Sequence, residues 1–275
     1  MPLIMGHEIT GEVVELGENV SEVKVGDRVC CINVSFSVEE GEVKALGTFQ
    51  DGGFAEYVKV PKKFIFPLPE NVPMKDAVMV ESFALAMRAL KLSKIESNQN
   101  IIIFGGGNVG LTILKTLLIE KNPDQIIVVE PHEFLRVKAL ELGATYAVPP
   151  GRPKIKRFLR EIGPPAFIFD CVGNEQTISD GLFLIKKGGT ILLEGMYKGS
   201  ISLRVFMVNS KEVTLKGCIS HDREDILAAI DLFAKNQINT NEFISEVIQL
   251  KDIQKTFERY LEPEGRNFIK IIVKP

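Results

Sequence analysis

Apolar and polar residues alternate in the first part of the chain, and the pattern changes to helical spacing near residue 74. Residues 8–17 alternate, and the short apolar segments 26–34 and 54–61 follow, with glycine and proline between them. This pattern is typical of short β-strands. Residues 74–94 are apolar at positions three and four apart, which predicts a helix. The opening of the chain is therefore expected to be rich in β-structure.

From residue 100 onward, short apolar segments alternate with longer helical ones. Strands are expected at residues 100–104, 125–130, 166–173, 190–195, 202–208 and 213–219. Helices are expected between them at residues 108–121, 133–143, 153–163 and 175–189. Regular alternation of strand and helix predicts a six-stranded parallel sheet with helices on both faces, the α/β arrangement of a Rossmann domain.

The C-terminal part differs from this alternation. Residues 223–237 predict another helix, and the apolar segment 267–273 predicts a closing strand. We expect this strand to return to the β-rich opening, so that the α/β unit is inserted between the two. The predicted domains are residues 1–83 with 221–275, and residues 84–220.

Composition narrows the class of protein. The chain has 275 residues, of which 45% are hydrophobic and 25% charged, with a net charge of -3, as in ordinary globular proteins. The only basic cluster, residues 151–160, is expected to be the exposed face of a helix, so a nucleic-acid partner is not expected. The most apolar run, residues 100–120, is broken by glycines and is not expected to enter a membrane.

The cysteines and the N-terminus indicate a cytoplasmic protein. No two cysteines form a C-x-x-C pair, so buried reduced thiols are expected at Cys30, Cys31, Cys171 and Cys218. The first ten residues lack the basic segment and the long apolar core of a signal peptide.

A glycine motif follows the strand expected at residues 100–104. Gly105, Gly107 and Gly110 have the G-x-G-x-x-G spacing, and Glu130 ends the next strand, twenty residues past Gly110. In this context the glycines allow a tight turn, a close approach of backbone to pyrophosphate, and close packing of helix on strand. Glu130 can accept hydrogen bonds from both ribose hydroxyls of NAD and would repel the extra phosphate of NADP. A glycine turn without a ligand is the alternative, and the strand, helix and acid together favour the dinucleotide.

Two further groups of residues belong to this predicted cofactor site. Asn108 and Val109 open the helix whose free N–H groups and positive dipole end would face the phosphates. Asp170 ends a central strand and is expected to face a cleft at the point where the strand order reverses. Val172 and Gly173 are then expected to line the nicotinamide through their backbone.

Four segments resemble the zinc-dependent medium-chain dehydrogenase/reductase superfamily, in the same order along the chain. They are GHEITGEVVELGENVSEVKVGDRV, DGGFAEYVKVP, VESFALAMRAL and KKGGTILLEG. The sorbitol, threonine and related alcohol dehydrogenases are the most similar groups. The resemblance implies a GroES-like catalytic domain with one zinc ion and a Rossmann domain with NAD. It places an alcohol or polyol substrate between them.

The resemblance also implies the metal ligands. His7 matches the zinc-binding histidine of the family, and Glu8 matches a glutamate that binds the metal in the sorbitol group. Glu81 matches the position that supplies a further cysteine or glutamate, and Ser82 stands where proline is usual. His7, Glu8 and Glu81 are therefore the expected catalytic residues, acting through the metal. The alternatives are a buried, metal-free His7, a Glu8 that caps or pairs locally, and a Glu81 that points to solvent.

Two histidines have no expected role in the site, and two regions depart from the pattern of the family. His132 and His221 are expected to be surface histidines without a catalytic role. An arginine is usual five residues past the acidic residue, near the adenine, but here that position is Leu135 and the arginine is Arg136. Residues 30–53 lack the four spaced cysteines of a structural zinc lobe, so no structural zinc is expected.

Relatives begin some tens of residues earlier, and that segment supplies the first zinc ligand, a cysteine. The chain thus resembles an N-terminally truncated member, and substoichiometric zinc is expected. The main functional hypothesis is an NAD-dependent, zinc-assisted oxidoreductase acting on a secondary alcohol or polyol. The alternatives are a truncated, weakly active or inactive nucleotide-binding homologue and a zinc-independent reductase. Residues 200–208 resemble the edge strand through which relatives pair, which implies a homodimer or homotetramer.

Overall fold

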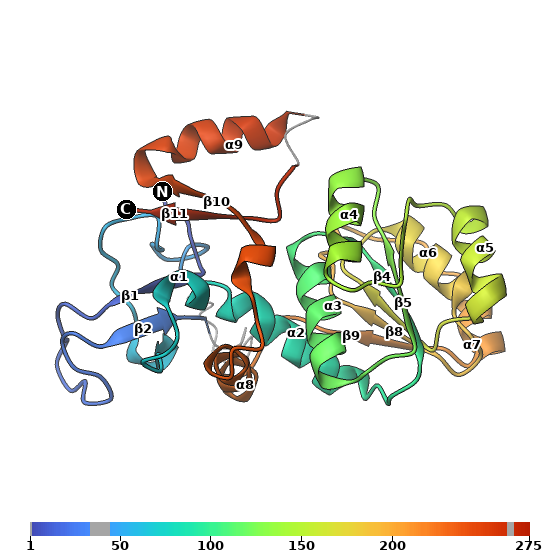
Figure 1. Ribbon diagram of the computed structural model, residues 1–275, viewed down its shortest axis with the longest axis horizontal. Helices are drawn as coiled ribbons and strands as arrows, with labels where there is room; N and C mark the ends of the chain where they lie inside the picture. The colour runs from blue at the N-terminus through green and yellow to red at the C-terminus, as the bar shows by residue number, and fades with distance from the viewer. Residues whose placement is uncertain (1, 34–44, 263–266) are drawn as a thin grey trace. The chain divides into compact units, whose positions relative to one another are not determined.

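The computed structural model describes residues 2–33, 45–262 and 267–275, and their contacts divide the chain into two compact units. The first unit contains the N-terminal residues up to Leu85, the segment that begins at Ser220, and Lys270–Pro275. The second unit is Ala86–Ile219 with residues 267–269 (Figure 1). Each unit has its own sheet and its own core.

The second unit contains a six-stranded parallel sheet, as predicted, but its strand at residues 146–148 was not expected and the strand expected at residues 202–208 does not form. The strands are β4 (Asn100–Phe104), β5 (Gln125–Val129), β6 (Tyr146–Val148), β7 (Phe167–Asp170), β8 (Thr190–Leu193) and β9 (Thr214–Gly217). Their order is β6-β5-β4-β7-β8-β9, and every neighbouring pair is parallel. The order reverses between β4 and β7, which is the position where open α/β sheets bind ligands.

Helices lie on both faces of this sheet (Figure 1). They are α3 (Asn108–Glu120), α4 (Glu133–Glu141), α5 (Arg152–Ile162), α6 (Glu175–Leu184) and α7 (Val205–Lys211). Ile102 and Phe104 of β4 share a buried cluster with Ile155 of α5, whereas Ile103 lies against Gly110 of α3. Successive side chains of the strand therefore serve opposite faces, as expected for a sheet that is covered on both sides.

Two predictions for residues 200–208 are wrong: the strand expected at residues 202–208, and the edge strand expected at residues 200–208. This segment is irregular up to Arg204 and continues as helix α7, whose Phe206 is 81% exposed. Lys211 at the end of α7 donates to the carbonyl oxygens of Leu182, Phe183 and Ile185, which ties α7 to the end of α6. A short apolar segment does not by itself distinguish a strand from a helix. The edge strands of the sheet are β6 and β9.

The first unit contains two smaller sheets. Strands β1 (Ile9–Glu12), β2 (Arg28–Cys31) and β3 (Ile65–Pro67) form an antiparallel sheet, and β10 (Ile244–Gln249) pairs in parallel with β11 (Lys270–Lys274). The strand expected at residues 54–61 is wrong, because this segment forms bends without strand pairing. The C-terminal strand is present as β11 and lies in the first unit.

The helix expected at residues 74–94 is divided in two, α1 (Met74–Ala77) and α2 (Val80–Ser93). The C-terminal part adds α8 (Arg223–Ala234) and α9 (Ile253–Leu261), and short 3-10 turns are η2 (Lys62–Phe64), η3 (Thr240–Glu242) and η4 (Leu250–Asp252). In the part of the chain that the structure describes, no helix is long and apolar enough to cross a bilayer.

Of the four thiols expected to be buried, Cys30, Cys31 and Cys218 are buried, whereas Cys171 is only partly buried. Cys30 and Cys31 of β2 are buried and free, and burial raises the pKa of each to about 12. Cys31 belongs to the small apolar core of the first unit, with Val23 and Val29. These thiols are therefore protonated core side chains at neutral pH.

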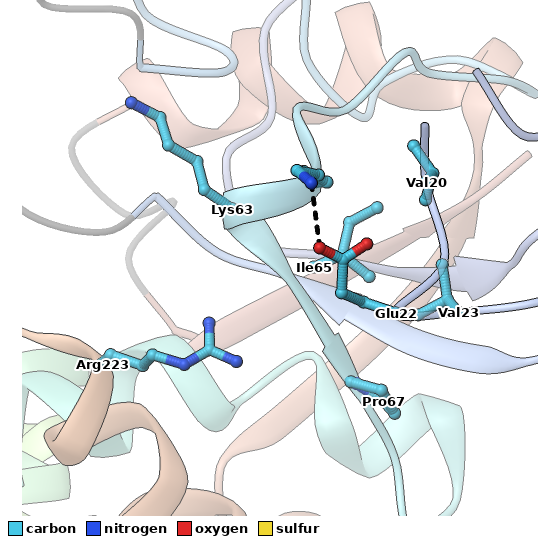
Figure 2. Close-up of a pocket in the computed structure, with 8 residues that line it drawn as sticks. Val20, Glu22, Val23, Lys63, Ile65, Pro67 and Arg223 are labelled. Atoms are coloured by element: carbon cyan, nitrogen blue, oxygen red, sulfur yellow. Dashed lines mark hydrogen bonds and ion pairs between the residues drawn. The ribbon is translucent and has the colours of Figure 1, made fainter. Parts of the chain in front are cut away.

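A pocket of about 430 Å³ opens on the first unit near the start of β3 (Figure 2). Its polar edge carries the ion pair between Lys62 and Glu22, 2.9 Å apart, whose hydrogen bond lowers the pKa of Glu22 to about 2. The lining residues are Val20, Glu22, Val23, Lys62, Lys63, Ile65, Pro67 and Arg223. None of them is a predicted site residue, so the pocket is separate from the candidate chemistry.

The aromatic cluster around Phe83 should dominate the stability of the first unit. The Phe83 ring is 0% exposed and meets the rings of Phe233 and Phe243 edge-on, with centroids 5.5 Å apart in both pairs. Phe83→Ala should lower the free energy of unfolding by about 3–5 kcal/mol, because it removes burial and leaves a cavity. Chemical denaturation followed by circular dichroism tests this. The exposed Phe49 provides a control, since Phe49→Ala should change stability little; equal losses in both variants would contradict the assignment.

Candidate active site

The glycine motif forms a tight turn between β4 and α3. Gly105 has a φ of +95°, which favours glycine. A Cβ at Gly110 would lie 1.9 Å from the Gly105 carbonyl oxygen, so a side chain there would break the turn. Gly107 precedes the first residue of α3, and a Cβ on it would meet nothing within 4 Å. The open space over Gly107 and the start of the thirteen-residue helix α3 are suited to a phosphate group.

Glu130 packs directly onto this turn. One of its carboxylate oxygens accepts a hydrogen bond from the Gly106 N–H at 2.8 Å, and the other accepts one from the His132 N–H at 2.9 Å. Each oxygen keeps a second lone pair for a ligand. Arg136 donates to the carbonyl oxygens of Glu130 and Pro131, at 3.0 and 2.6 Å, so its guanidinium fixes the same loop. The structure thus brings together the glycine turn, Glu130 and Arg136.

Asp170 differs from expectation, because it does not face a cleft. Its side chain is 0% exposed and accepts hydrogen bonds from the Val172 and Gly173 N–H groups, at 3.0 and 3.1 Å. It also accepts from the hydroxyls of Thr177 and Tyr197, at 2.7 and 2.5 Å. Through these hydrogen bonds Asp170 fixes the turn after β7. Burial raises the pKa of the Tyr197 hydroxyl.

The turn that Asp170 holds lies beside the glycine turn. Val172 is 42% exposed, and its side chain would lie 3.1 Å from a Cβ placed on Gly105. Gly173 has a φ of +75° and would clash with Gly195 if it carried a side chain. The loops after β4, β7 and β8 therefore meet with little space between their backbones.

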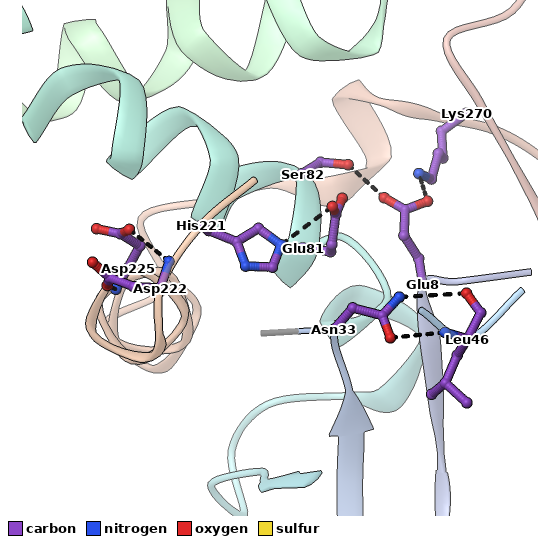
Figure 3. A network of polar contacts seen from close by, with 9 residues as sticks. All are labelled: Glu8, Asn33, Leu46, Glu81, Ser82, His221, Asp222, Asp225 and Lys270. Atoms are coloured by element: carbon purple, nitrogen blue, oxygen red, sulfur yellow. Dashed lines mark hydrogen bonds and ion pairs between the residues drawn. The ribbon is translucent and has the colours of Figure 1, made fainter. Parts of the chain in front are cut away.

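A polar network joins distant parts of the first unit (Figure 3). Glu8 lies just before β1. Its carboxylate accepts a hydrogen bond from the Ser82 hydroxyl at 2.6 Å and forms an ion pair with Lys270. Ser82 comes from α2 and Lys270 from β11. Glu8 is therefore paired, but with residues that are distant in the sequence and not, as the alternative expected, with local ones.

Glu81 makes a second pair in this network, with His221. Its Oε1 lies 3.3 Å from Nε2 of His221, so the alternative that Glu81 points to solvent is wrong. Burial alone would raise the pKa of Glu81, but the hydrogen bond and charge of His221, with His7 and Lys270, hold it below its ordinary value. His7 is thus near enough to influence Glu81, although its own side chain is exposed.

His221 is the residue that sequence reasoning missed. It was expected at the surface, yet it is 4% exposed, and its Nδ1 is buried without a hydrogen-bond partner. Helix α8 begins two residues later with a capping box in which Asp222 and Asp225 exchange hydrogen bonds. This cap fixes the chain just after His221. The capping pattern is readable in the sequence, but the direction of the preceding side chain is not.

The residues with metal-binding side chains do not form a zinc centre as they stand. Across residues 2–33, 45–262 and 267–275, no group of three or more His, Cys, Asp or Glu side chains is arranged to hold a metal ion. Glu8 and Glu81 are already paired with Lys270 and His221. Among the described residues, Glu8 and Glu81 would therefore have to leave Lys270 and His221 before they could hold a zinc ion. The expectation about a structural zinc falls mostly on residues 34–44, which lie outside the described residues.

Both parts of the chain are similar to known families of proteins. Residues 1–70 match the alcohol dehydrogenase GroES-like domain, and residues 109–235 match the zinc-binding dehydrogenase family. D-xylulose reductase of Saccharomyces cerevisiae is 30% identical, in a match that covers 100% of this chain and 82% of that protein.

Solved structures extend the comparison. A 2R,3R-butanediol dehydrogenase from Bacillus subtilis is 27% identical with a TM-score of 0.89, covering 100% of this chain and 81% of that one. A zinc-binding dehydrogenase from Sinorhizobium meliloti, bound to NADP, is 25% identical with a TM-score of 0.86, covering 100% and 84%. The GroES-like and Rossmann folds expected from the sequence are thereby confirmed.

The pairing of Glu8 with Lys270 generates a prediction about zinc. A metal ion at Glu8 must displace the Lys270 ammonium, so Lys270→Met should tighten zinc binding roughly tenfold, the equivalent of one charge-assisted hydrogen bond. Zinc per subunit after dialysis, by mass spectrometry, and the shift of melting temperature on adding zinc measure this. Lys274→Met, an exposed position on the same strand, is the matched control. Unchanged zinc affinity in the Lys270 variant would contradict the competition.

Proposed function

We propose, from the premise that this chain belongs to the zinc-binding dehydrogenase family, that it transfers hydride between a secondary alcohol or polyol and NAD. Membership follows from the 30% identity to D-xylulose reductase over 82% of that protein, together with the two domain matches. The observation that carries the proposal is the position of Glu130. This residue directly follows β5, and its carboxylate lies against the glycine turn. A small-molecule alcohol or polyol is the proposed substrate class, since the relatives are named for D-xylulose and butanediol.

The preference for NAD depends on charge. Glu130 is held by two backbone N–H groups, from Gly106 and His132, so it cannot easily turn away from an incoming ligand. A carboxylate there accepts hydrogen bonds from ribose hydroxyls and repels a phosphate on the same ribose. One structural relative is bound to NADP, so membership of the family does not decide the cofactor. The choice in this chain rests on Glu130.

The reaction requires little covalent participation by the protein. A hydride leaves the alcohol carbon for the nicotinamide, and the hydroxyl proton leaves to a base or to water. The protein must bind both molecules, orient the two carbons and exclude water. We assign no step to zinc, because Glu8 and Glu81 are paired with Lys270 and His221. The same pairing favours, as the second candidate, a metal-independent reductase of this superfamily.

The remaining proposals concern the oligomeric state and the cellular location of the protein. We propose a homodimer or homotetramer, now through the edge of β9, and size-exclusion chromatography with light scattering would test it. A cytoplasmic location is proposed from the four cysteines, none of which forms a disulfide.

Cofactor choice gives the first test. Isothermal titration should show tighter binding of NAD than of NADP, and Glu130→Ala should reduce the ratio by roughly tenfold or more, because the repulsive group is removed. Glu133→Ala removes the same charge from an exposed position three residues away and should leave the ratio unchanged. Equal affinities in the unmodified chain would refute the NAD assignment.

Activity gives the second test. Incubation with NAD and a panel of secondary alcohols and polyols should produce NADH, followed by its absorbance. A parallel assay after treatment with a chelator separates the candidates, since the metal-independent reductase keeps its rate and the zinc-assisted enzyme loses it. A chain that binds NAD but oxidises none of the panel, and reduces none of the corresponding ketones, would instead be an inactive nucleotide-binding homologue.

A further inference from the structure

Glu194 is a buried acid that the proposed chemistry has not used. It follows β8 directly, and both of its carboxyl oxygens are buried without a hydrogen-bond partner among the described residues. Burial raises its pKa to about 7, against a smaller opposing effect of the Cys218 thiol, which is a weak donor. An acid left unpaired in this way is costly in a folded protein unless something binds it.

The position of Glu194 repeats the position of Glu130. The sheet order β6-β5-β4-β7-β8-β9 consists of two three-stranded halves that meet between β4 and β7. Glu130 directly follows β5, the middle strand of one half, and Glu194 directly follows β8, the middle strand of the other. In such a sheet each half binds one nucleotide of a dinucleotide. Glu194 therefore stands where the second nucleoside is expected.

Among the described acids at the ends of β7 and β8, Glu194 is the one whose carboxyl oxygens lack a hydrogen-bond partner. Asp170, at the end of β7, already accepts four hydrogen bonds, two from the loop that follows it and one each from Thr177 of α6 and Tyr197. Burial raises the pKa of Cys171, with smaller contributions from Glu194 and Asp170, so its thiol stays protonated. A Cβ on Gly195 would come within 2.2 Å of the Gly173 nitrogen, so the loops after β7 and β8 touch through backbone.

We propose that the carboxyl group of Glu194 binds the carboxamide of the nicotinamide ring. The inference rests on the proposed function, because it needs a bound dinucleotide. A protonated acid offers one O–H donor and one carbonyl acceptor. A primary carboxamide offers the complementary acceptor and donor in one plane, so the two groups can form a pair of hydrogen bonds. A ribose offers no such planar pair, and its hydroxyls are served equally well by a carboxylate.

Titration of three ligands distinguishes the possibilities. ADP-ribose shares the adenosine, pyrophosphate and second ribose of NAD but lacks the nicotinamide. Glu194→Leu should weaken NAD roughly tenfold while leaving ADP-ribose unchanged, since a charge-neutral pair of hydrogen bonds is lost. Glu194→Gln keeps a planar donor and acceptor and should retain NAD affinity within a few-fold. Nicotinic acid adenine dinucleotide, which carries a carboxylate in place of the carboxamide, should bind the unmodified chain more weakly than NAD does.

The outcomes separate this inference from the proposed function. Equal weakening of NAD and ADP-ribose in Glu194→Leu would assign the acid to the ribose and overturn the carboxamide pairing. Unchanged NAD affinity in the same variant would overturn it as well. If the unmodified chain binds neither ADP-ribose nor NAD, the proposed function itself fails. Melting curves of both variants establish that the second unit is folded in each titration.

Discussion

A parallel sheet brings the carboxyl ends of all its strands to one edge, and the chemistry of the second unit depends on this constraint. Gly105 follows β4, Glu130 follows β5, Asp170 ends β7 and Glu194 follows β8. These residues are far apart in the sequence, yet the hydrogen-bond register of the strands makes them neighbours. The glycines are needed because three loops meet there, and a side chain at Gly110 or Gly195 would collide with backbone.

The first unit is constrained differently, because it contains two largely buried carboxylates that must be paired. Glu8 is paired with Lys270, 262 positions away, and Glu81 with His221, 140 positions away. A buried charge that loses its partner is strongly destabilising, so each acid requires a cation or donor within reach. The pairing therefore couples the closing strand β11 to the segment at the start of the chain, and the loop before α8 to helix α2. It also lets these acids be buried without a metal ion.

The alternation of strand and helix patterns in the sequence was sufficient for five of the six strands in the sheet of the second unit, and for the glycine turn with Glu130. These depend on periodicity and on residues whose conformational role is local, such as Gly105 with its positive φ. The errors have a different origin. Residues 54–61 and 200–208 are short apolar segments whose structure is decided by tertiary contacts, for example those of Lys211 with α6. His221 is buried because of partners more than a hundred positions away, which no local pattern reports.

Glu130 and Glu194 show why the fold alone does not set the chemistry of a site. Both follow the middle strand of a three-stranded half, and both are shielded from solvent. Glu130 receives a backbone N–H on each oxygen, because the glycine turn and the following loop point their amides at it. Glu194 receives none, because the loops beside it pack backbone against backbone and Asp170 takes the N–H groups of Val172 and Gly173. One acid is thereby suited to accept hydrogen bonds from a diol, and the other to exchange them with an amide.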